Sequence, residues 1–341
     1  MPRDRKRIIL LLCGIAVLVL IPVLALCSKA QENVISAAAD AYLNDPDTSF
    51  NISSKNLLPK MLGADRPLIV SVRKAEDFAI GHIAGAVNIP FGTLFENASL
   101  SKLPKDNKTI VYCYTGHTAS QATALLNLCG YDATNLEWGI MGWTKDTTVA
   151  ITQFANPESD LPVETTANEP TATYVRPSVD VTSSSVDSEI IKAACNAYAS
   201  AGPKNTTAGD LLNLIMDGDD SNDPVIVSVR SPEQYAKGHI PGAINISFKE
   251  IAKVENLEKL NPGKQIVVYC DTGRTASQAT AILNTLGYDA SNLLWGMTGW
   301  TTDPEIAPNR FDPAASANYP VKASEGAAPA PSEDSGGGCG G

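Results

Sequence analysis

One stretch of this chain occurs twice, and the duplication limits what the chain can fold into. Residues 68–143 align with residues 225–300 without a gap, at an offset of 157 residues. Between residues 109–143 and 266–300, about two-thirds of the positions are identical. Solenoid repeats are much shorter, so this period indicates a duplicated domain. With 341 residues, the chain has room for two domains that each bury a core.

Within each repeat, the hydrophobic pattern predicts strands that alternate with helices. Helical lead-ins cover residues 35–43 and 190–198, and nearly continuous apolar runs follow at residues 67–72 and 224–229. Such runs are typical of parallel strands that are buried on both faces. A short strand, a central strand, a glycine-bearing loop and a small-residue helix come next. The pattern predicts an α/β fold, with a small parallel sheet flanked by helices in each repeat.

Helix boundaries are also marked in the sequence. Ser53 or Ser54 can cap a short helix in the first repeat, and Thr207 can cap its counterpart in the second. The helices that follow the glycine-bearing loops are expected to stop at Gly130 and Gly287, since glycine commonly ends a helix.

Composition divides the chain into five parts. The joint between the repeats is rich in Thr, Ser, Pro and Val and has no helical period, which is typical of an extended linker. The C-terminal part is rich in Ala, Pro and Gly and is expected to be disordered. The predicted parts are a signal or membrane anchor (1–30), a first domain (31–152), a linker (153–185), a second domain (186–312) and a tail (313–341).

The N-terminal part has the pattern of an export segment. Residues 8–26 are apolar throughout and follow a cationic stretch at residues 3–7. A helix of this length just crosses a hydrocarbon core of about 30 Å. The cationic flank would keep the N-terminus in the cytoplasm, so both domains are expected outside it, membrane-anchored or secreted. The segment could be retained, cleaved after Ala30 or lipidated at Cys27, and the sequence leaves these fates open.

Charge and cysteine usage exclude several classes of function. The net charge of −11 at pH 7 disfavours nucleic acid as a partner. Seven cysteines are too sparse for a disulfide scaffold, and no Cys-x-x-Cys pair supports a zinc site. With three histidines, a histidine-rich metal site is improbable, and we expect neither metal nor cofactor. Cys129 and Cys195 are expected to be packing residues.

Two cysteines stand where chemistry is expected. Cys113 and Cys270 end the central strands, and each precedes a tight loop that leads into a helix. Unpaired amides and the positive end of the helix dipole would then face the sulfur and favour its anion. Gly116 and Gly273 allow close approach of the backbone, and threonines can add hydroxyl donors at Thr115, Thr118, Thr272 and Thr275.

These motifs, taken in order, resemble the rhodanese family of sulfurtransferases. Residues 73–89 and 230–246 share an arginine, a glutamate, an aromatic residue and Gly-His-Ile-x-Gly-Ala-x-Asn-Ile. Both repeats continue with Tyr-Cys-x-Thr-Gly-x-Thr-Ala-Ser, and both end similarly to that family's Gly-Gly-x-x-x-Trp. The resemblance covers each whole domain and implies two tandem rhodanese-like domains.

Two departures from the family pattern are visible. Ser71 and Ser228 stand where the family usually has aspartate, two residues before the motif arginines Arg73 and Arg230. The arginines are expected to be held differently as a result. Trp138 and Trp295 replace the first glycine of the terminal pair.

The resemblance implies sulfur transfer through a cysteine persulfide. Cys113 or Cys270 would take the outer sulfur from thiosulfate or a related anion, and a thiol or cyanide would then accept it. Covalent catalysis of this kind gives ping-pong kinetics. The predicted substrate-binding residues are those of the two loops and the motif arginines: Tyr114, Thr115, Gly116, His117, Thr118, Asp271, Thr272, Gly273, Arg274, Thr275, Arg73 and Arg230.

The two loops differ in charge, and this predicts different substrates. Arg274 is permanently cationic and could attract an anionic donor, with Asp271 partly offsetting it. His117 would be charged only at mildly acidic pH. We therefore expect the second domain to use thiosulfate better than the first.

Two other functions are compatible with parts of the pattern. A rhodanese-like phosphatase or arsenate reductase generally needs a longer loop that ends in arginine. Here cysteine to threonine spans six residues, which disfavours phosphate. A non-catalytic scaffold that binds a partner or senses redox state is the remaining alternative, although a scaffold has no need of a cysteine in both copies.

Overall fold

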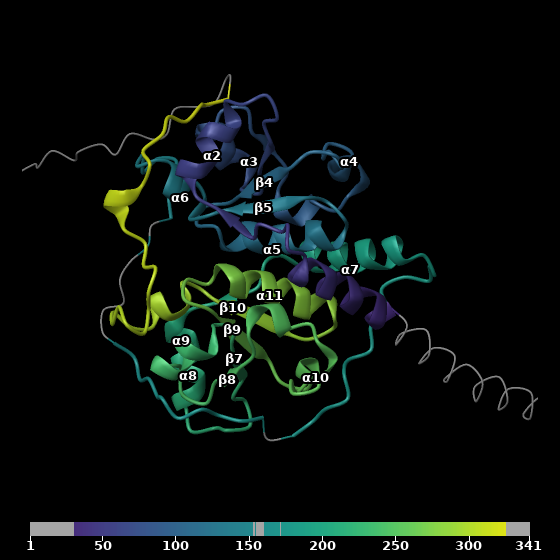
Figure 1. Cartoon of the computed structure of the whole chain (residues 1–341), viewed down its shortest axis with the longest axis vertical. Helices are drawn as coiled ribbons and strands as arrows, with labels where there is room; N and C mark the ends of the chain where they lie inside the picture. Colours follow the sequence, from purple (N-terminus) through teal and green to yellow (C-terminus); the bar gives the residue numbers. More distant parts are fainter. Residues whose placement is uncertain (1–30, 153, 155–159, 171, 325–341) are drawn as a thin grey trace, which may run out of the picture.

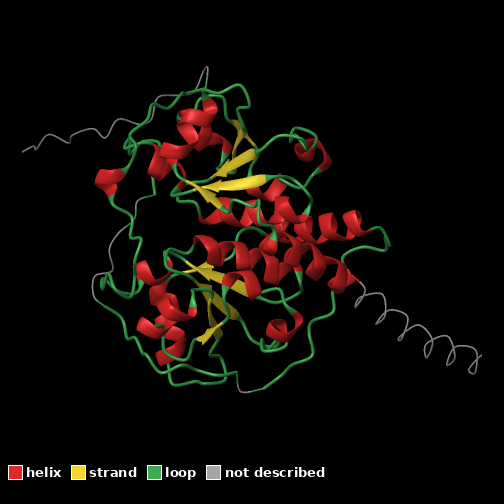
Figure 2. Cartoon of the chain, in the orientation of Figure 1, coloured by secondary structure: helices red, strands yellow, loops and turns green. Residues whose placement is uncertain are grey.

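The computed structural model describes residues 31–152, 154, 160–170 and 172–324. These residues form two lobes that lie one above the other in Figure 1, and each lobe is built around a five-stranded parallel sheet. Helices cover both faces of each sheet (Figure 2). The predicted α/β fold, with a parallel sheet flanked by helices in each repeat, is confirmed.

The two sheets have the same topology. The strand order is β1-β5-β4-β2-β3 in the first lobe and β6-β10-β9-β7-β8 in the second. The central strands β4 and β9 are completely buried, which explains their unbroken apolar sequence. The bounds are β1 Asn51–Ile52, β2 Leu68–Ser71, β3 Val87–Asn88, β4 Thr109–Tyr112, β5 Ala133–Leu136, β6 Asn205–Thr206, β7 Val225–Ser228, β8 Ile244–Asn245, β9 Ile266–Tyr269 and β10 Ala290–Leu293.

The helices follow the predicted order in both repeats. A helix over residues 31–44 precedes the first sheet. The others are α2 Ser54–Met61, α3 Ala75–Ile80, α4 Asn97–Leu100, α5 His117–Leu128, α6 Gly139–Trp143, α7 Asp187–Ala201, α8 Ala208–Met216, α9 Pro232–Lys237, α10 Val254–Leu257 and α11 Arg274–Thr285. Four short 3-10 helices complete the described set: η1 Phe91–Thr93, η2 Phe248–Glu250, η3 Gly296–Gly299 and η4 Pro313–Ala315.

The predicted helix boundaries are confirmed. The hydroxyl of Ser53 accepts a hydrogen bond from the Asn56 amide, and Thr207 caps α8 in the same way. The chain leaves α5 and α11 through Gly130 and Gly287, which have φ of 74° and 87°. Glycine adopts this left-handed conformation without a steric penalty.

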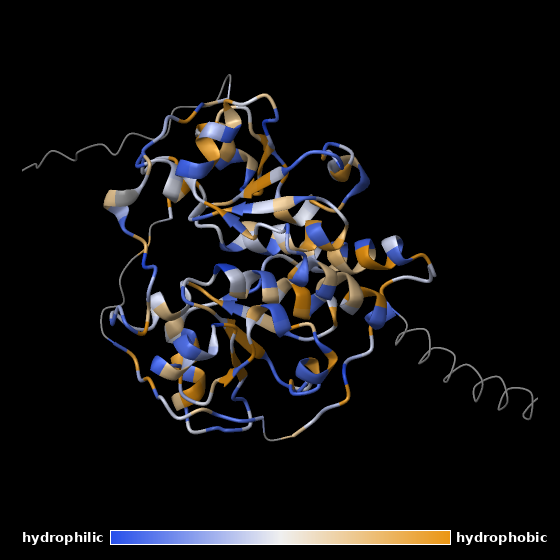
Figure 3. Cartoon of the chain, in the orientation of Figure 1, coloured by the Kyte–Doolittle hydropathy of each residue, from blue (hydrophilic) through white to orange (hydrophobic). Residues whose placement is uncertain are grey.

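The helices α5 and α11 pack against each other and join the two lobes (Figure 1). One hydrophobic core cluster runs through both repeats and includes Val111, Leu125, Val268 and Ile282. Hydrophobic colours lie on the strands inside each lobe, and hydrophilic colours dominate the outer loops (Figure 3). Because the apolar core is continuous between the lobes, we expect the described residues to fold as one unit.

Each lead-in helix reaches across to the opposite repeat. In the helix over residues 31–44, the Tyr42 hydroxyl donates to Gln278 Oε1 of α11 at 2.8 Å. In α7, the Tyr198 hydroxyl donates to Gln121 Oε1 of α5 at 2.9 Å. The sequence assigned each lead-in to the domain that follows it, and these hydrogen bonds connect each lead-in to the other repeat as well. Helix α7 also packs against α11 of its own repeat, so it contacts both lobes.

The segments that follow the repeats are exchanged as well. After the first repeat, the linker runs along the second, where the indole N–H of Trp300 donates to the Pro162 carbonyl at 2.7 Å. After the second repeat, the chain returns to the first, where the indole N–H of Trp143 donates to the Pro320 carbonyl at 3.1 Å. Lys322 extends this contact by pairing with His82.

The prediction that the tail is disordered from residue 313 is therefore wrong for residues 313–324. Buried indole N–H groups need an acceptor, and a returning backbone supplies it. Residues 325–341, with Cys339, lie outside the described residues, as does the apolar segment 8–26 with its predicted anchor or signal. Among the residues that the structure does describe, no helix is long and apolar enough to cross a membrane.

Candidate active site

The two predicted cysteines occupy equivalent positions at the ends of the central strands. Cys113 follows β4, and its Sγ accepts a hydrogen bond from the Gly116 amide at 3.1 Å. Cys270 follows β9, and its Sγ accepts from the Gly273 amide at the same distance. These glycines have φ of 93° and 82° and start the 12-residue helices α5 and α11. Each sulfur therefore lies at the positive end of a helix dipole, where an anion is favoured.

The tail motif of each repeat braces the cysteine loop from the other side. The Ile140 amide donates to the Cys113 carbonyl at 2.9 Å, and the Met297 amide donates to the Cys270 carbonyl at 2.9 Å. A Cβ on Gly139 or Gly296 would lie only 2.5 or 2.1 Å from these same carbonyl oxygens. The second glycine of the tail motif is thus needed for the close approach that fixes the loop.

Tryptophan occupies the first position of that motif, and both tryptophans adopt the left-handed conformation. Trp138 has φ of 61° and Trp295 has φ of 65°, in a region where non-glycine residues are strained. Their rings stack on each other between the lobes, with centroids 6.4 Å apart. The departure from glycine thus places an aromatic pair at the interface between the two cysteine loops.

The motif arginine Arg73 is buried and bonded to the backbone. Its Nη2 donates to the Gly81 carbonyl at 2.6 Å, and its Nε lies 3.4 Å from the Ser71 hydroxyl. The guanidinium also lies over the rings of Tyr112 and Tyr114. These hydrogen bonds go to the backbone and to Ser71, so we interpret Arg73 as a group that holds the chain around the site.

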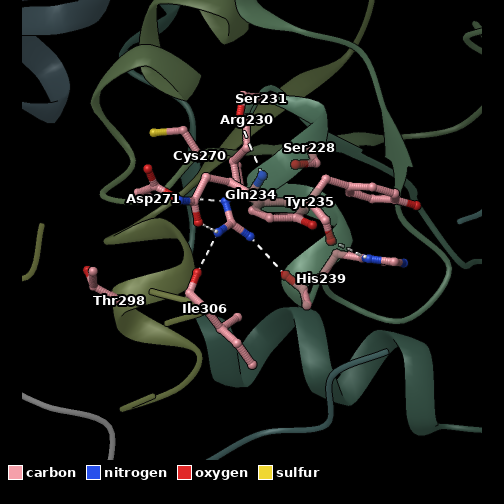
Figure 4. A network of polar contacts seen from close by, with 12 residues as sticks. Ser228, Arg230, Ser231, Gln234, Tyr235, His239, Cys270, Asp271, Thr298 and Ile306 are labelled. Carbon is pink, nitrogen blue, oxygen red and sulfur yellow. Dashed lines mark hydrogen bonds and ion pairs between the residues drawn. The ribbon is translucent and has the colours of Figure 1, made fainter. Parts of the chain in front are cut away.

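Arg230 is held in a similar network, drawn in Figure 4. Its Nη1 donates to the Gly238 carbonyl at 2.9 Å, and Nη2 donates to Gln234 and to the Ile306 carbonyl. Its Nε forms an ion pair with Asp271 at 2.7 Å. Burial raises the pKa of Asp271, and the neighbouring Arg230 partly opposes the rise. The carboxylate of Asp271 is therefore held by its ion pair with Arg230.

In the first loop, Tyr114 takes the place of Asp271. Its hydroxyl donates to Asp77 Oδ2 and accepts from the Lys74 amide. Burial, followed by the Asp77 hydrogen bond, raises the pKa of Tyr114 to about 12. The tyrosine is thus neutral at physiological pH and brings no charge to the Cys113 loop.

The structure places His117 in the contact between the two loops. Its Nε2 lies 3.0 Å from the Thr272 carbonyl of the other repeat, and its Nδ1 lies 2.9 Å from the Thr115 hydroxyl. Nε2 also lies 3.4 Å from the Trp295 amide, but the Thr272 carbonyl is closer and can only accept, so the proton is assigned to Nε2. Burial lowers the pKa of His117 to about 4. The expectation that His117 becomes charged at mildly acidic pH is wrong, because the second repeat covers the ring.

Arg274 is the residue of the second repeat that is equivalent to His117, and its side chain contacts the first repeat. Its guanidinium carbon lies 4.2 Å from the ring centroid of Trp138, and its Nη2 lies 3.9 Å from Glu137 Oε1. Its Nη1 is buried and has no hydrogen-bond partner among the described residues. Burial lowers the pKa of Arg274, and Glu137, Cys270 and Asp271 oppose this.

A cavity of about 300 Å³ lies at the Cys270 loop. It brings together most of the predicted residues of the second site, and it also includes residues that the sequence did not single out. Asn51 comes from β1 of the first repeat, so the second site is built from both domains. The lining residues are Asn51, Val229, Arg230, Ser231, Phe248, Cys270, Asp271, Thr272, Arg274, Thr275 and Asn309.

The hydroxyl groups of the loops have different surroundings. Thr115 is buried and bonded to His117, whereas Thr118 is half-buried at the start of α5. Thr272 and Thr275 both line the Cys270 cavity.

Among the described residues, no group of three or more His, Cys, Asp or Glu could hold a metal ion.

Comparison with known proteins agrees with this geometry. The model of the rhodanese-like domain matches the chain twice, over residues 54–146 and 207–303. The two matches together cover more than half of the sequence. The chain belongs to the rhodanese-like domain family. Both matches contain a cysteine loop and its bracing tail motif, and neither contains the exchanged lead-in helices or trailing segments.

Several rhodanese-like relatives are named sulfurtransferases. The thiosulfate sulfurtransferase PspE of Escherichia coli is 44% identical over 64 residues, which are 18% of this chain and 60% of PspE. A sulfurtransferase of Allochromatium vinosum is 30% identical over 95 residues, 28% of this chain and 87% of that protein. The probable adenylyltransferase/sulfurtransferase MoeZ of Mycobacterium tuberculosis is 36% identical over 78 residues, 23% of this chain and 20% of MoeZ. The matches thus span from a fifth to somewhat under two-thirds of the length of MoeZ and PspE.

Sequence reasoning missed several residues at this rhodanese-like site, and three of them come from the first repeat. Asn51 and Glu137 reach the second site from the first repeat, and Trp138 lies against Arg274. One signal was available: Glu137 aligns with Leu294, just as Arg274 aligns with His117. Glu137 is charged only in the first repeat, and Arg274 only in the second. Two opposite charges that each occur in one repeat are a hint that the two side chains are in contact.

Proposed function

We propose that this chain is a sulfurtransferase that moves sulfane sulfur through a cysteine persulfide. The observation that carries the proposal is the position of each sulfur, bonded to a loop amide at the N-terminus of a helix. A helix N-terminus suits an anionic nucleophile, and it equally suits the terminal sulfur of a persulfide. The family membership and the names of the relatives support the same reaction class.

The reaction consists of two displacements. A cysteine thiolate attacks the outer sulfur of thiosulfate, the sulfur–sulfur bond of thiosulfate breaks, and sulfite leaves with the bonding electron pair. The enzyme then carries a cysteine persulfide anion. A thiolate acceptor, or cyanide, attacks the outer sulfur of the persulfide and releases the cysteine thiolate. Because the enzyme is modified between the two steps, ping-pong kinetics are expected.

The second site is the better candidate for thiosulfate. Arg274 lines the cavity at Cys270, and one of its guanidinium nitrogens is buried without a partner among the described residues. As a lining residue, Arg274 puts a permanent positive charge at the cavity wall, where it favours an anionic donor. The equivalent residue of the first loop, His117, is neutral and has both ring nitrogens bonded within the protein. We therefore expect Cys270→Ser to abolish most of the thiosulfate activity and Cys113→Ser to leave most of it.

We also propose that the two domains lie outside the cytoplasm, membrane-anchored or secreted. The support is the cationic stretch at residues 3–7 followed by the apolar residues 8–26. Separation of membrane and soluble fractions, followed by protease treatment of intact cells, tests this. Protection of both domains from the protease in intact cells would contradict it.

The steady-state kinetics of the full chain test the proposed reaction. With thiosulfate as donor and dithiothreitol or cyanide as acceptor, double-reciprocal plots should be parallel, and sulfite should form in proportion to the sulfur transferred. A chain that releases no sulfite with any of these acceptors is a binding scaffold, the alternative that the sequence left open.

A further inference from the structure

We infer that Trp138 of the first repeat positions Arg274 in the donor site of the second repeat. The affinity of the Cys270 site for an anionic donor would then depend on a side chain of the other domain. The inference rests on the proposed function, because it concerns the same reaction at Cys270. It assigns Trp138 a positioning role, since Trp138 touches the arginine and not the reacting sulfur.

The contacts of Arg274 are directional. The face of the Trp138 ring lies under the guanidinium, at a distance typical of a cation–π interaction. Glu137 lies near Nη2, at 3.9 Å. The arginine also lines the cavity at Cys270, while its Nη1 is buried and has no hydrogen-bond partner among the described residues. The permanent positive charge of the guanidinium at the wall of this cavity would attract an anionic donor.

The ring of Trp138 is itself held firmly. Its backbone is left-handed, and the ring stacks on Trp295 and lies 5.0 Å from the ring of Phe311. Gly142 makes room for it, since a Cβ there would lie 2.8 Å from the Cβ of Trp138. A long arginine side chain loses much conformational freedom when ordered, and a rigid ring fixes its position before the donor arrives.

The equivalent contact at the first loop, between His117 and Trp295 of the second repeat, involves no charged group. His117 lies edge-on to Trp295, with ring centroids 4.8 Å apart, and is neutral. The position equivalent to Glu137 is Leu294. Of the two cysteine sites, only the Cys270 site therefore has a cation packed against an aromatic ring of the opposite repeat. One nitrogen of that cation is buried without a hydrogen-bond partner among the described residues.

The test uses the full chain with Cys113→Ser, so that turnover reports on Cys270 alone. Thiosulfate is the donor, and dithiothreitol is an uncharged acceptor. Trp138→Gly removes the ring and keeps the backbone, since glycine adopts positive φ readily. We expect kcat/KM for thiosulfate to fall about threefold to tenfold, with kcat/KM for dithiothreitol unchanged. Arg274→Gln should lower kcat/KM for thiosulfate by about tenfold or more.

Two further variants separate positioning from general loosening of the interface. In the Arg274→Gln background, Trp138→Gly should cause no further loss, since the arginine that it positions is gone. Tyr198→Phe removes the hydrogen bond between α7 and Gln121 Oε1 of α5, and so loosens the contact between the repeats away from Trp138 and Arg274. It should leave kcat/KM for thiosulfate within about twofold of the parent.

Several outcomes would overturn the inference. These are an unchanged kcat/KM for thiosulfate in Trp138→Gly, losses that multiply in the double variant, an equal fall in both half-reactions, or an equal effect of Tyr198→Phe. A Cys113→Ser parent that forms no persulfide on Cys270 with thiosulfate would instead contradict the proposed function, and the inference with it. Persulfide formation on Cys270 in the parent therefore distinguishes a failure of the positioning role from a failure of the proposed function.

Discussion

At the scale of single residues, burial between the repeats decides the charge of the first loop. His117 was expected to titrate in mildly acidic solution, yet its ring is covered by the Thr272 carbonyl and by Trp295. Desolvation disfavours the imidazolium and lowers the pKa of His117 to about 4. The sequence could not predict this, because the covering groups come from the other repeat.

The low pKa of His117 predicts a pH dependence of stability. The unfolded chain takes up the proton near the ordinary pKa, and the folded chain does so only near pH 4. Stability due to His117 is thus complete above the ordinary pKa and is lost as the pH falls towards 4. Between pH 7.5 and pH 5, the free energy of unfolding should fall by roughly 2 kcal/mol on account of His117.

Urea unfolding at these two pH values measures the effect. His117→Gln keeps a donor and an acceptor but cannot titrate, so its loss of stability between pH 7.5 and pH 5 should be smaller by about the same roughly 2 kcal/mol. An identical pH dependence in the variant and the parent would show that His117 is not buried as described.

At the scale of elements, the exchanged lead-in helices are the main departure from the sequence prediction. The strands, helix caps and cysteine loops were predictable because they depend on local patterns such as the apolar run of β4 and the cap at Ser53. Which repeat a lead-in helix packs against was not predictable. The two repeats are so similar that α5 and α11 offer nearly the same surface, and an amphipathic pattern fits either.

The exchanged helix over residues 31–44 should contribute measurably to stability. Tyr42→Phe removes the hydroxyl that donates to Gln278 Oε1 and leaves that buried oxygen without its donor. The free energy of unfolding should fall by about 1–3 kcal/mol. Tyr319→Phe is the matched control, because its ring packs on Trp143 and its hydroxyl forms no hydrogen bond with the described residues. Equal stabilities of the two variants would contradict the exchange.

At the scale of the whole molecule, the two domains are completed by each other. The lead-in helices, the linker and the returning segment that ends near Lys322 all cross between the repeats, and one core cluster spans them. Duplication was readable from the sequence, but the interlocking was not, since the tail was expected to be disordered. The cavity at Cys270, with Asn51 from the first repeat in its wall, is a product of that interlocking.

Interlocked domains should unfold together. In differential scanning calorimetry of the full chain, we expect one transition whose calorimetric enthalpy equals the van't Hoff enthalpy. Independent domains would instead give a calorimetric enthalpy well above the van't Hoff value, or two separate peaks. Either of those results would contradict the continuous core.

The central claim is that sulfur is carried on the loop cysteines. Its most direct test is mass spectrometry of the purified full chain after incubation with thiosulfate, followed by digestion without reductant. We predict that the peptide with Cys270 gains the mass of one sulfur atom, that the peptide with Cys113 gains it to a smaller extent, and that dithiothreitol reverses both. Absence of the added sulfur on both peptides would contradict the account.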